Sequence, residues 1–306
     1  MQQIQYSSGD VVADRRAFHA AALAAERAFA DAAEVMSQAL EVAPQWVAGW
    51  SLLGSYREAA GDIAGAVGAW LELLRLDRSG VFGARLKLAA HGALADTRPE
   101  PAYVEALFDD YAPRFEQSLV DGLGYQIPDI IAAAVARWMS ARGVIRFARA
   151  VDLGCGTGLM GERLRPLVGR LEGVDLSANM LKRAERKRVY DRLEKADLAE
   201  FLEREPAPVD LVVAADVFNY VGALDASVQA IGRATAPGGV LAFSLETHEG
   251  DAPARLMSSL RFQHAVAPTL ALCERHGLAI VEVERVTVRM DRRLPVEGVV
   301  VVAEKA

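Results

Sequence analysis

Val151-Asp-Leu-Gly-Cys-Gly-Thr-Gly158 decides the fold expected for this chain of 306 residues. The stretch ends an apolar run, Phe147 to Leu153, and gives way to a helical pattern from Leu159. Its glycines permit a tight turn from strand to helix and let a ligand approach the backbone closely. The stretch therefore predicts a ligand-binding turn at the carboxyl end of a strand.

Short Val-rich runs alternate with amphipathic helical patterns after about residue 148. This alternation is typical of a parallel sheet covered by helices, so the predicted fold class is α/β. After the first strand, further strands are expected at Leu171–Asp175, just before Lys195, at Pro208–Asp216, at Ala236–Phe243, at Ala279–Met290 and at Val296–Ala303.

Two acidic residues flank the glycine turn. Asp152 precedes it, where a carboxylate can hold a cationic amino group directly or through water. Asp175 ends the next predicted strand, and an acid there suits bidentate hydrogen bonding to the two hydroxyls of a ribose. Ser177 is expected to cap the following helix, with Met180 on its first turn, near where an adenine would stack.

One alternative is a dinucleotide site, because Gly156–Gly161 fits G-x-G-x-x-G, the fingerprint of nicotinamide and flavin binding. Asp175 also follows this motif at a suitable distance, although the motif alone is weak. A dehydrogenase would in addition need a second substrate domain with a catalytic His or Lys, for which there is no room.

Three motifs in order resemble the class I methyltransferases that use S-adenosylmethionine. The first is the D-x-G-x-G-x-G arrangement that begins at Asp152. The second is Lys195-Ala-Asp197-Leu198, placed where those enzymes use an Asp to accept from the adenine amino group. The third is Pro208–Asp216, a strand that would end beside the sulfonium, with Ala236–Phe243 as the following turn and strand. The resemblance covers roughly residues 103–306.

The resemblance implies a Rossmann-like sheet of seven strands whose last strand is antiparallel. It also implies S-adenosylmethionine as cofactor and S-adenosylhomocysteine as product. The cofactor-binding residues that it implies are Tyr111, Asp152, Gly154, Cys155, Gly156, Gly158, Asp175, Leu176, Met180, Asp197, Leu198, Ala215 and Asp216. Cys155 is expected to fit the turn through its small size rather than to act as a nucleophile, and no metal site is expected.

The segment from Tyr103 to Arg142 is predicted as amphipathic helices, broken at Gly122, Gly124 and Pro128. Its aromatics resemble a lid over the methionine end of the cofactor. The lid candidates are Tyr111, Phe115 and Tyr125, with Arg114 as a possible partner for a carboxylate. The alternative is that these aromatics only dock the front helices onto the sheet.

Methyl transfer from a sulfonium is an in-line displacement, in which the protein mainly positions donor and acceptor. An oxygen acceptor would also need a base. The candidates are His264, His248 and Tyr220. The two histidines lie between the fifth strand and the last helix, where this fold places substrate-facing loops, and Tyr220 follows the strand expected to end beside the sulfonium.

The first part of the chain, residues 1–98, predicts a separate helical domain ahead of residues 99–306. Ala32, Met36, Ala39 and Leu40 recur 34 residues later as Ala66, Trp70, Leu73 and Leu74, a period that resembles tetratricopeptide repeats. The match is partial, since Arg16 stands where the pattern has an aromatic and Arg78 where it has a closing Pro. A helix at Val81–Leu94 is expected to cap the stack, and an Ala-rich helical bundle is the alternative.

The net charge of −7 and pI near 5.4 argue against broad contact with nucleic acid. Two cysteines, no apparent leader and no long apolar run indicate a cytoplasmic protein without a membrane partner. The function expected is a small-molecule O- or N-methyltransferase. Two alternatives stay open: a protein methyltransferase whose repeats recruit the target, and a cofactor-binding module without turnover.

Overall fold

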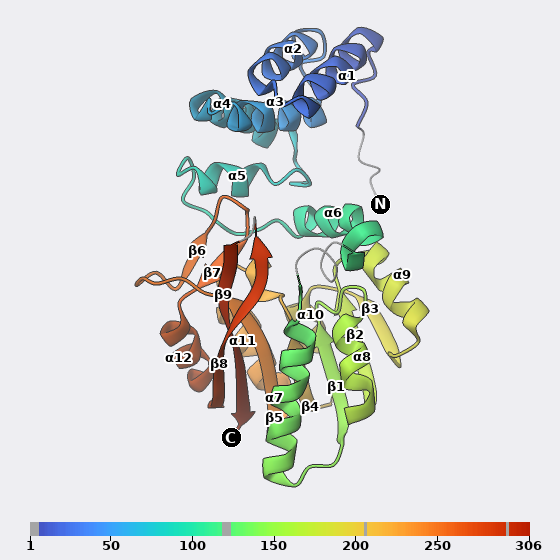
Figure 1. Cartoon of the computed structure of the whole chain (residues 1–306), viewed down its shortest axis with the longest axis vertical. Helices are drawn as coiled ribbons and strands as arrows, with labels where there is room; N and C mark the ends of the chain where they lie inside the picture. The colour runs from blue at the N-terminus through green and yellow to red at the C-terminus, as the bar shows by residue number, and fades with distance from the viewer. Residues whose placement is uncertain (1–5, 118–123, 205–206, 292–293) are drawn as a thin grey trace. The chain divides into compact units, whose positions relative to one another are not determined.

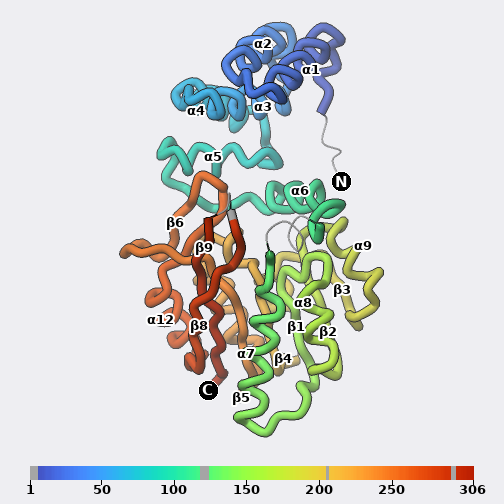
Figure 2. Tube along the Cα trace, viewed as in Figure 1, coloured from blue at the N-terminus to red at the C-terminus, as the bar shows by residue number. Residues whose placement is uncertain are grey.

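The computed structural model describes residues 6–117, 124–204, 207–291 and 294–306 (Figures 1 and 2). The chain divides into two compact units, Met1–Tyr103 and Val104–Ala306. The division falls inside helix α6 (Pro101–Tyr111), and each unit has hydrophobic clusters of its own. In the described parts of the chain, no helix has both the length and the apolar character needed to cross a bilayer.

The second unit is built on a seven-stranded sheet with the order β3-β2-β1-β4-β5-β9-β8. Strands β1 to β5 pair in parallel, whereas β9 is antiparallel to both of its neighbours. The predicted seven-stranded sheet with an antiparallel last strand is therefore confirmed. The strands are β1 (Phe147–Leu153), β2 (Val168–Asp175), β3 (Arg192–Lys195), β4 (Val209–Ala214), β5 (Thr235–Glu246), β8 (Leu278–Asp291) and β9 (Leu294–Lys305).

Helices cover both faces of this sheet, because successive residues of a buried strand point to opposite faces. Ala150 belongs to the cluster shared with α7 and α8, and its neighbour Val151 belongs to the cluster shared with α10, α11 and α12. Both faces are apolar, which explains the continuous Val-rich runs of the sequence. The helices are α7 (Ile127–Arg142), α8 (Leu159–Leu164), α9 (Ala178–Lys187), α10 (Leu198–Arg204), α11 (Asp225–Ala234) and α12 (Val266–Arg275).

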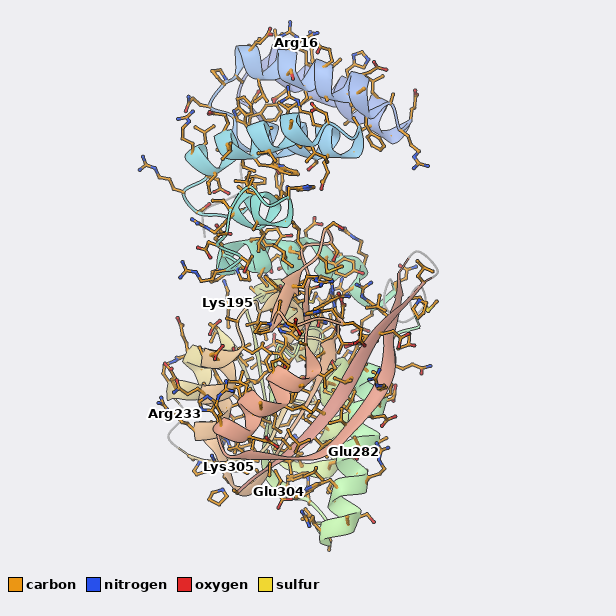
Figure 3. The ribbon with its side chains drawn as sticks, turned by 90° about the vertical axis from the view of Figure 1, so that its left-hand side faces the viewer. Arg16, Lys195, Arg233, Glu282, Glu304 and Lys305 are labelled. Carbon is orange, nitrogen blue, oxygen red and sulfur yellow. The ribbon has the colours of Figure 1, made fainter. Side chains whose placement is uncertain are left out.

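Helix α7 is also joined to the terminal hairpin by ion pairs. Arg137 contacts Glu282 at 2.5 Å, and Arg142 contacts Glu304 at 2.6 Å (Figure 3). Pro128 lies in the first turn of α7, where its missing N–H leaves no helical bond unmade, so it starts this helix rather than breaking one. Gly122 of the predicted helix breaks lies outside the described residues.

A small hairpin, β6 (Ala254–Leu256) with β7 (Phe262–His264), lies between β5 and α12. It is joined to the end of β5 by a bridge between Thr247 and His264. The sequence does not predict this hairpin, because two strands of three residues are too short to show an alternating pattern.

The first unit contains two helical hairpins and one shorter helix. Ala32, Met36 and Ala39 are fully buried, and so are Ala66, Trp70 and Leu73 at the equivalent positions of the next hairpin. The last helix covers less than the predicted Val81–Leu94. The helices are α1 (Val11–Ala25), α2 (Phe29–Val42), α3 (Val47–Ala59), α4 (Ile63–Leu76) and α5 (Ala84–Ala90).

Two contacts account for unusual residues in these hairpins. A Cβ on Gly54 would lie 2.1 Å from the indole nitrogen of Trp70, so only glycine lets α3 and α4 approach this closely. Arg16 (Figure 3), which stands where an aromatic is expected, instead donates a hydrogen bond of 2.6 Å to the carbonyl of Gln38 on α2.

Candidate functional site

The glycine turn joins β1 to α8 with its three glycines in the left-handed region, at φ of +61° for Gly154, +53° for Gly156 and +90° for Gly158. L-residues with a side chain rarely adopt this region. A Cβ on Gly154 would also lie 2.6 Å from the Val217 side chain, which follows β4. The turn is held by a hydrogen bond of 3.0 Å from the Cys155 N–H to the carbonyl of Val174. Both the φ angles and this close approach require glycine here.

Asp175, at the end of β2, holds the turn from the other side. One carboxylate oxygen accepts from the Gly156 N–H at 2.9 Å, and the second accepts from the Ser177 N–H at 2.7 Å. Burial raises the pKa of this carboxyl to about 6. Each carboxylate oxygen has two lone pairs, so Asp175 keeps acceptor capacity for two further hydroxyl groups.

Asp152, at the end of β1, is 1% exposed. Its Oδ2 accepts a hydrogen bond of 2.6 Å from the Tyr190 hydroxyl, whereas Oδ1 has no partner among the described residues. Burial raises the pKa of this carboxyl to about 7. A buried carboxylate oxygen without a partner is costly, so this position fits a ligand that brings a donor with positive charge.

Tyr190 is a site residue that the sequence reasoning missed. Its ring fills space left by glycines: a Cβ on Gly161 would lie 2.3 Å from the hydroxyl, and one on Gly173 would lie 2.9 Å from the ring. Gly161, the third glycine of the G-x-G-x-x-G pattern, is therefore needed to admit Tyr190. An extra glycine beyond the turn, together with a tyrosine before β3, is the signal that could have revealed the pair.

Three further predicted contacts lie nearby. Ser177 caps α9 as expected, accepting from the Met180 N–H at 3.0 Å, but the Met180 side chain is fully buried in the protein. The Asp197 carboxylate caps α10 by accepting from the Ala199 N–H at 2.8 Å. Leu176 and Leu198 are only partly buried, and Leu198 packs against one core cluster. The Asp197 carboxylate already caps α10, so a hydrogen bond from adenine would have to be made in addition to this cap.

Aromatic residues of α6 and of the segment that follows it lie near the glycine turn. Phe115 lies 4.0 Å from the position of a Cβ on Gly156 and packs edge-on against Tyr111, with the ring centroids 5.4 Å apart. Phe108 packs against Tyr220 with centroids 4.9 Å apart. These rings form an aromatic cluster that extends from α6 to Tyr220. Arg114 instead pairs with the exposed Asp110.

Polar contacts fasten this segment to the sheet. The Asp109 carboxylate accepts from the Ser177 hydroxyl at 2.5 Å and from the Asn179 N–H at 3.0 Å, both at the N-terminus of α9. Lys195 (Figure 3), at the end of β3, pairs with Glu105 at 2.6 Å. The segment is thus tied to two elements that flank the Asp175 carboxylate.

A second polar cluster lies beyond β4 and β5, and Arg261 of the small hairpin is at its centre. Its guanidinium contacts Asp216 at 3.2 Å and Glu246 at 2.6 Å, and it also donates to the Tyr220 hydroxyl. Arg289 contacts the same Glu246 oxygen at 3.2 Å. All of these charged side chains are at most 13% exposed. Here the structure brings the predicted Asp216 and Tyr220 together.

Asp216 adopts φ of +62°, which is uncommon for a residue with a side chain. Its backbone N–H donates to the Ser244 hydroxyl at 2.8 Å, and its carboxylate accepts from the Asn219 amide. Ala215 before it packs against a core cluster. Strain held by several bonds in this way is common at functional sites, and here it turns the Asp216 carboxylate toward Arg261.

The aromatic and histidine candidates differ in their surroundings. Burial, followed by the charge of Asp216, raises the pKa of Tyr125 well above its usual range. His264 is buried with Nε2 3.0 Å from the Phe218 carbonyl, and burial lowers its pKa. Both ring nitrogens of His248 are buried and lack a partner in the described part of the chain. Burial raises the pKa of Cys155 well above its usual value, so this thiol stays protonated.

Comparison with known proteins adds to this geometry. Residues 151–241 match the family model described as a methyltransferase domain. The chain is 33% identical over 141 residues to malonyl-[acyl-carrier protein] O-methyltransferase of Enterobacter lignolyticus strain SCF1, an alignment that covers 46% of this chain and 52% of that protein. It is 30% identical over 196 residues to human methyltransferase-like protein 27, covering 62% of this chain and 71% of that protein. It thus spans about half of the first relative and more than two thirds of the second.

A solved structure shares the fold. Magnesium protoporphyrin IX methyltransferase from Synechocystis PCC 6803, solved with bound S-adenosylhomocysteine, matches 67% of this chain and 99% of its own chain, with a TM-score of 0.51 and 17% identity. Three observations indicate the same family: the glycine turn between two acidic strand ends, the order of the strands, and the two relatives. The chain belongs to the class I methyltransferases, the family whose cofactor is S-adenosylmethionine.

Proposed function

We propose that this protein transfers a methyl group from S-adenosylmethionine to the oxygen or nitrogen of a small molecule. The observation that carries the proposal is the buried Asp152 Oδ1, which has no partner among the described residues and lies beside the glycine turn. The ammonium group of the cofactor's methionine part would satisfy it. Asp175 would accept from the two ribose hydroxyls, and the amides of the turn would face the cofactor closely.

The bound cofactor would supply an electrophilic methyl group on sulfur. The chain's own residues would then mainly bind and orient, because an in-line displacement requires alignment and exclusion of water. Asp152 and Asp175 would fix two ends of the cofactor. Phe108, Tyr111 and Phe115 would keep water from the reacting atoms.

The acceptor would lie beside the Arg261 cluster. The Tyr220 oxygen accepts from Arg261, so its own proton is free to be donated to an acceptor atom. Burial raises the pKa of Tyr220, so we assign it an orienting role rather than that of a base. The Asp216 carboxylate would accept from an acceptor's O–H or N–H. Of the two histidines, His248 is the better candidate to take a proton, because its ring nitrogens have no partner among the described residues, whereas His264 is bonded to backbone.

The names of two relatives support a small acceptor. One is the malonyl carrier-protein methyltransferase, and another is a ubiquinone biosynthesis O-methyltransferase of Burkholderia ambifaria, 32% identical over 111 residues. The first acts on an acyl group and the second in the synthesis of a quinone, both of which are small compared with a protein surface.

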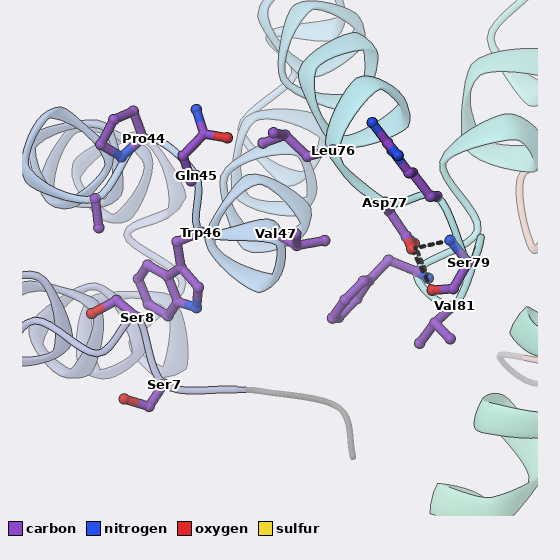
Figure 4. A pocket seen from close by; sticks show the side chains of 13 residues that line it. Ser7, Ser8, Pro44, Gln45, Trp46, Val47, Leu76, Asp77, Ser79 and Val81 are labelled. Carbon is purple, nitrogen blue, oxygen red and sulfur yellow. Dashed lines mark hydrogen bonds between the residues drawn. The ribbon is translucent and has the colours of Figure 1, made fainter. Parts of the chain in front are cut away.

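A protein acceptor is the second candidate, favoured by a cavity in the first unit. The cavity has a volume of about 590 Å³ and lies at the loops that link the helical hairpins (Figure 4). Trp46 and Phe82 give it apolar walls, and Arg78 gives it an exposed charge. If these hairpins are tetratricopeptide-like repeats, as their spacing predicts, the cavity would hold a side chain of the partner.

The cytoplasm is the compartment we propose, because both cysteines are buried free thiols.

Calorimetry with S-adenosylmethionine, S-adenosylhomocysteine and NAD tests the cofactor. Binding of the two sulfur compounds but not NAD is expected, and binding of NAD alone would return the glycine turn to the dinucleotide alternative. A screen of small acceptors with a labelled methyl group then tests turnover. Label on a protein, lost in an Arg78→Glu variant, would favour the protein acceptor. Tight binding without label on any acceptor would favour a module without turnover.

A further inference from the structure

Tyr190 lies outside every element that sequence reasoning assigned to the site, yet it touches the carboxylate at its centre. We propose that Tyr190 is a positioning residue for the cofactor: its hydroxyl holds Asp152 in the charged form and directs the free carboxylate oxygen at the cofactor's ammonium group. The inference rests on the proposed function, because it assigns that ammonium group to Asp152.

The geometry allows Tyr190 one place only. Its ring lies in a slot made by Gly158, Gly161 and Gly173, and a Cβ at any of the three would lie 3.1 Å or less from a Tyr190 atom. The ring therefore cannot shift without moving the glycine turn itself. Its hydroxyl is fixed at 2.6 Å from Asp152 Oδ2.

This contact determines which oxygen is free. Because Oδ2 is engaged by Tyr190, the oxygen left without a partner is Oδ1. The carboxyl group is 1% exposed, so bulk water does not compete strongly for it. A carboxylate whose direction is fixed in advance binds a cation with less loss of side-chain freedom.

The charge of Asp152 depends on few neighbours. Burial raises its pKa to about 7, the Tyr190 hydrogen bond lowers it, and the negative charge of Asp175 raises it. Among the described residues, the other titratable groups that interact with it are the Cys155 thiol and the Tyr125 phenol, both neutral near pH 7 because burial raises their pKa. None of these four groups is a cation. Tyr190 is thus the neighbour that favours the carboxylate.

The consequence for binding has a definite sign. An ammonium group binds the carboxylate and not the protonated acid, so affinity should fall as pH falls through the pKa of Asp152. An α-amino group loses its own charge above about pH 8. Removal of the Tyr190 hydroxyl raises the pKa of Asp152 further. The pH range in which the ammonium group binds then becomes narrower at its acidic end.

The test is calorimetry of S-adenosylhomocysteine binding from pH 5.5 to 8.5, with wild type and Tyr190→Phe. The acidic limb is the fall in affinity toward low pH. In Tyr190→Phe it is expected to move up by roughly one pH unit, which at pH 6.5 means about tenfold weaker binding. Asp152→Asn should bind weakly and lose the part of the acidic limb near pH 7, so that any remaining fall is that of Asp175, whose pKa is about 6. Tyr56→Phe in the first unit should match wild type. An unchanged limb in a folded Tyr190→Phe protein would overturn the inference.

A second measurement covers the case in which Tyr190→Phe folds poorly. Replacement of Tyr190 by 3-fluorotyrosine keeps the hydroxyl and makes it a stronger donor, so the acidic limb should move down. A limb that stays in place, or wild-type binding without any acidic limb, would contradict the role given to Tyr190. Wild-type protein that binds neither sulfur compound at any pH would instead refute the proposed function.

Discussion

The Asp109 carboxylate on α6 accepts a hydrogen bond of 2.5 Å from the Ser177 hydroxyl at the N-terminus of α9. Ser177 follows Asp175, whose carboxylate accepts from the Ser177 N–H. One serine therefore joins α6, which ends at the lid candidate Tyr111, to the acid expected to bind the ribose. The carboxylate of Asp109 also suits the positive end of the α9 dipole.

Asp109→Ala should loosen the lid and release the cofactor faster, by about three- to tenfold, because a bond to a charged group is lost. Stopped-flow measurement of the dissociation rate checks this. Asp110→Ala is the matched control, since its neighbouring carboxylate is exposed and pairs with Arg114. Equal rates for the two variants would show that the Asp109 contact does not hold the lid.

Asp175→Ala should weaken cofactor binding by roughly a hundredfold or more, because it removes the acceptor for both ribose hydroxyls and a bond to the glycine turn. Asp191→Ala serves as control, since Asp191 also accepts from backbone but does so at Leu171, in the middle of β2. Near-unchanged affinity of Asp175→Ala in calorimetry would refute the assignment.

Asp152→Asn should stabilise the cofactor-free protein at alkaline pH. The folded pKa of about 7 lies above the usual carboxyl value of 3.8, so the stability due to the protonated acid is present at low pH and lost as pH rises through 7. The amide avoids this loss and can still accept from Tyr190. Urea unfolding at pH 8 should show a gain of about 4 kcal/mol that shrinks toward pH 4. No gain at pH 8 would contradict the raised pKa.

Gly161→Ala should displace the Tyr190 ring, because the new Cβ would lie 2.3 Å from the hydroxyl. Cofactor affinity should fall, and adding Tyr190→Phe should not restore it, because the new Cβ would also lie 2.4 Å from the ring carbon Cζ. Gly68→Ala on α4 is the control: nothing lies within 4 Å of its Cβ, and a stability gain of about 0.5–1 kcal/mol is expected. Calorimetry and urea unfolding measure the two effects, and wild-type affinity in Gly161→Ala would disprove the crowding.

Arg261→Met should lower stability by about 3–5 kcal/mol, because it leaves the buried Asp216 and Glu246 carboxylates with fewer partners. The double change with Glu246→Gln should recover part of this loss in urea unfolding. Cofactor affinity should stay close to wild type, since the proposed acceptor, and not the cofactor, would lie beside Arg261. A double variant no more stable than Arg261→Met would argue against a coupled network.

The elements with strong periodic patterns could be predicted from the sequence. The strands of the large sheet and the glycine turn follow from Val-rich runs and from the residues around Asp152. The sequence patterns could not predict that the Met180 side chain is buried in the core or that the Asp197 carboxylate caps a helix. Such outcomes depend on how the helices pack.

The sequence also missed Tyr190 and Arg261, for two different physical reasons. Tyr190 is 38 residues from Asp152, and only the packing of its ring against glycines brings the two together. Arg261 is carried by a hairpin too short to show a pattern, so its ion pairs with Asp216 and Glu246 appear only once β6 and β7 form.

That hairpin forms a two-stranded sheet of its own, and among the described residues its backbone pairs with the large sheet at one bridge, between Thr247 and His264. The parallel strands and the glycine turn do not depend on its sequence for their pairing. The segment between Glu246 and Val266 could therefore be replaced, in evolution or by design, without changing the half of the domain expected to bind the cofactor. New chemistry for such a scaffold would begin with grafted hairpins in place of Ala254–His264.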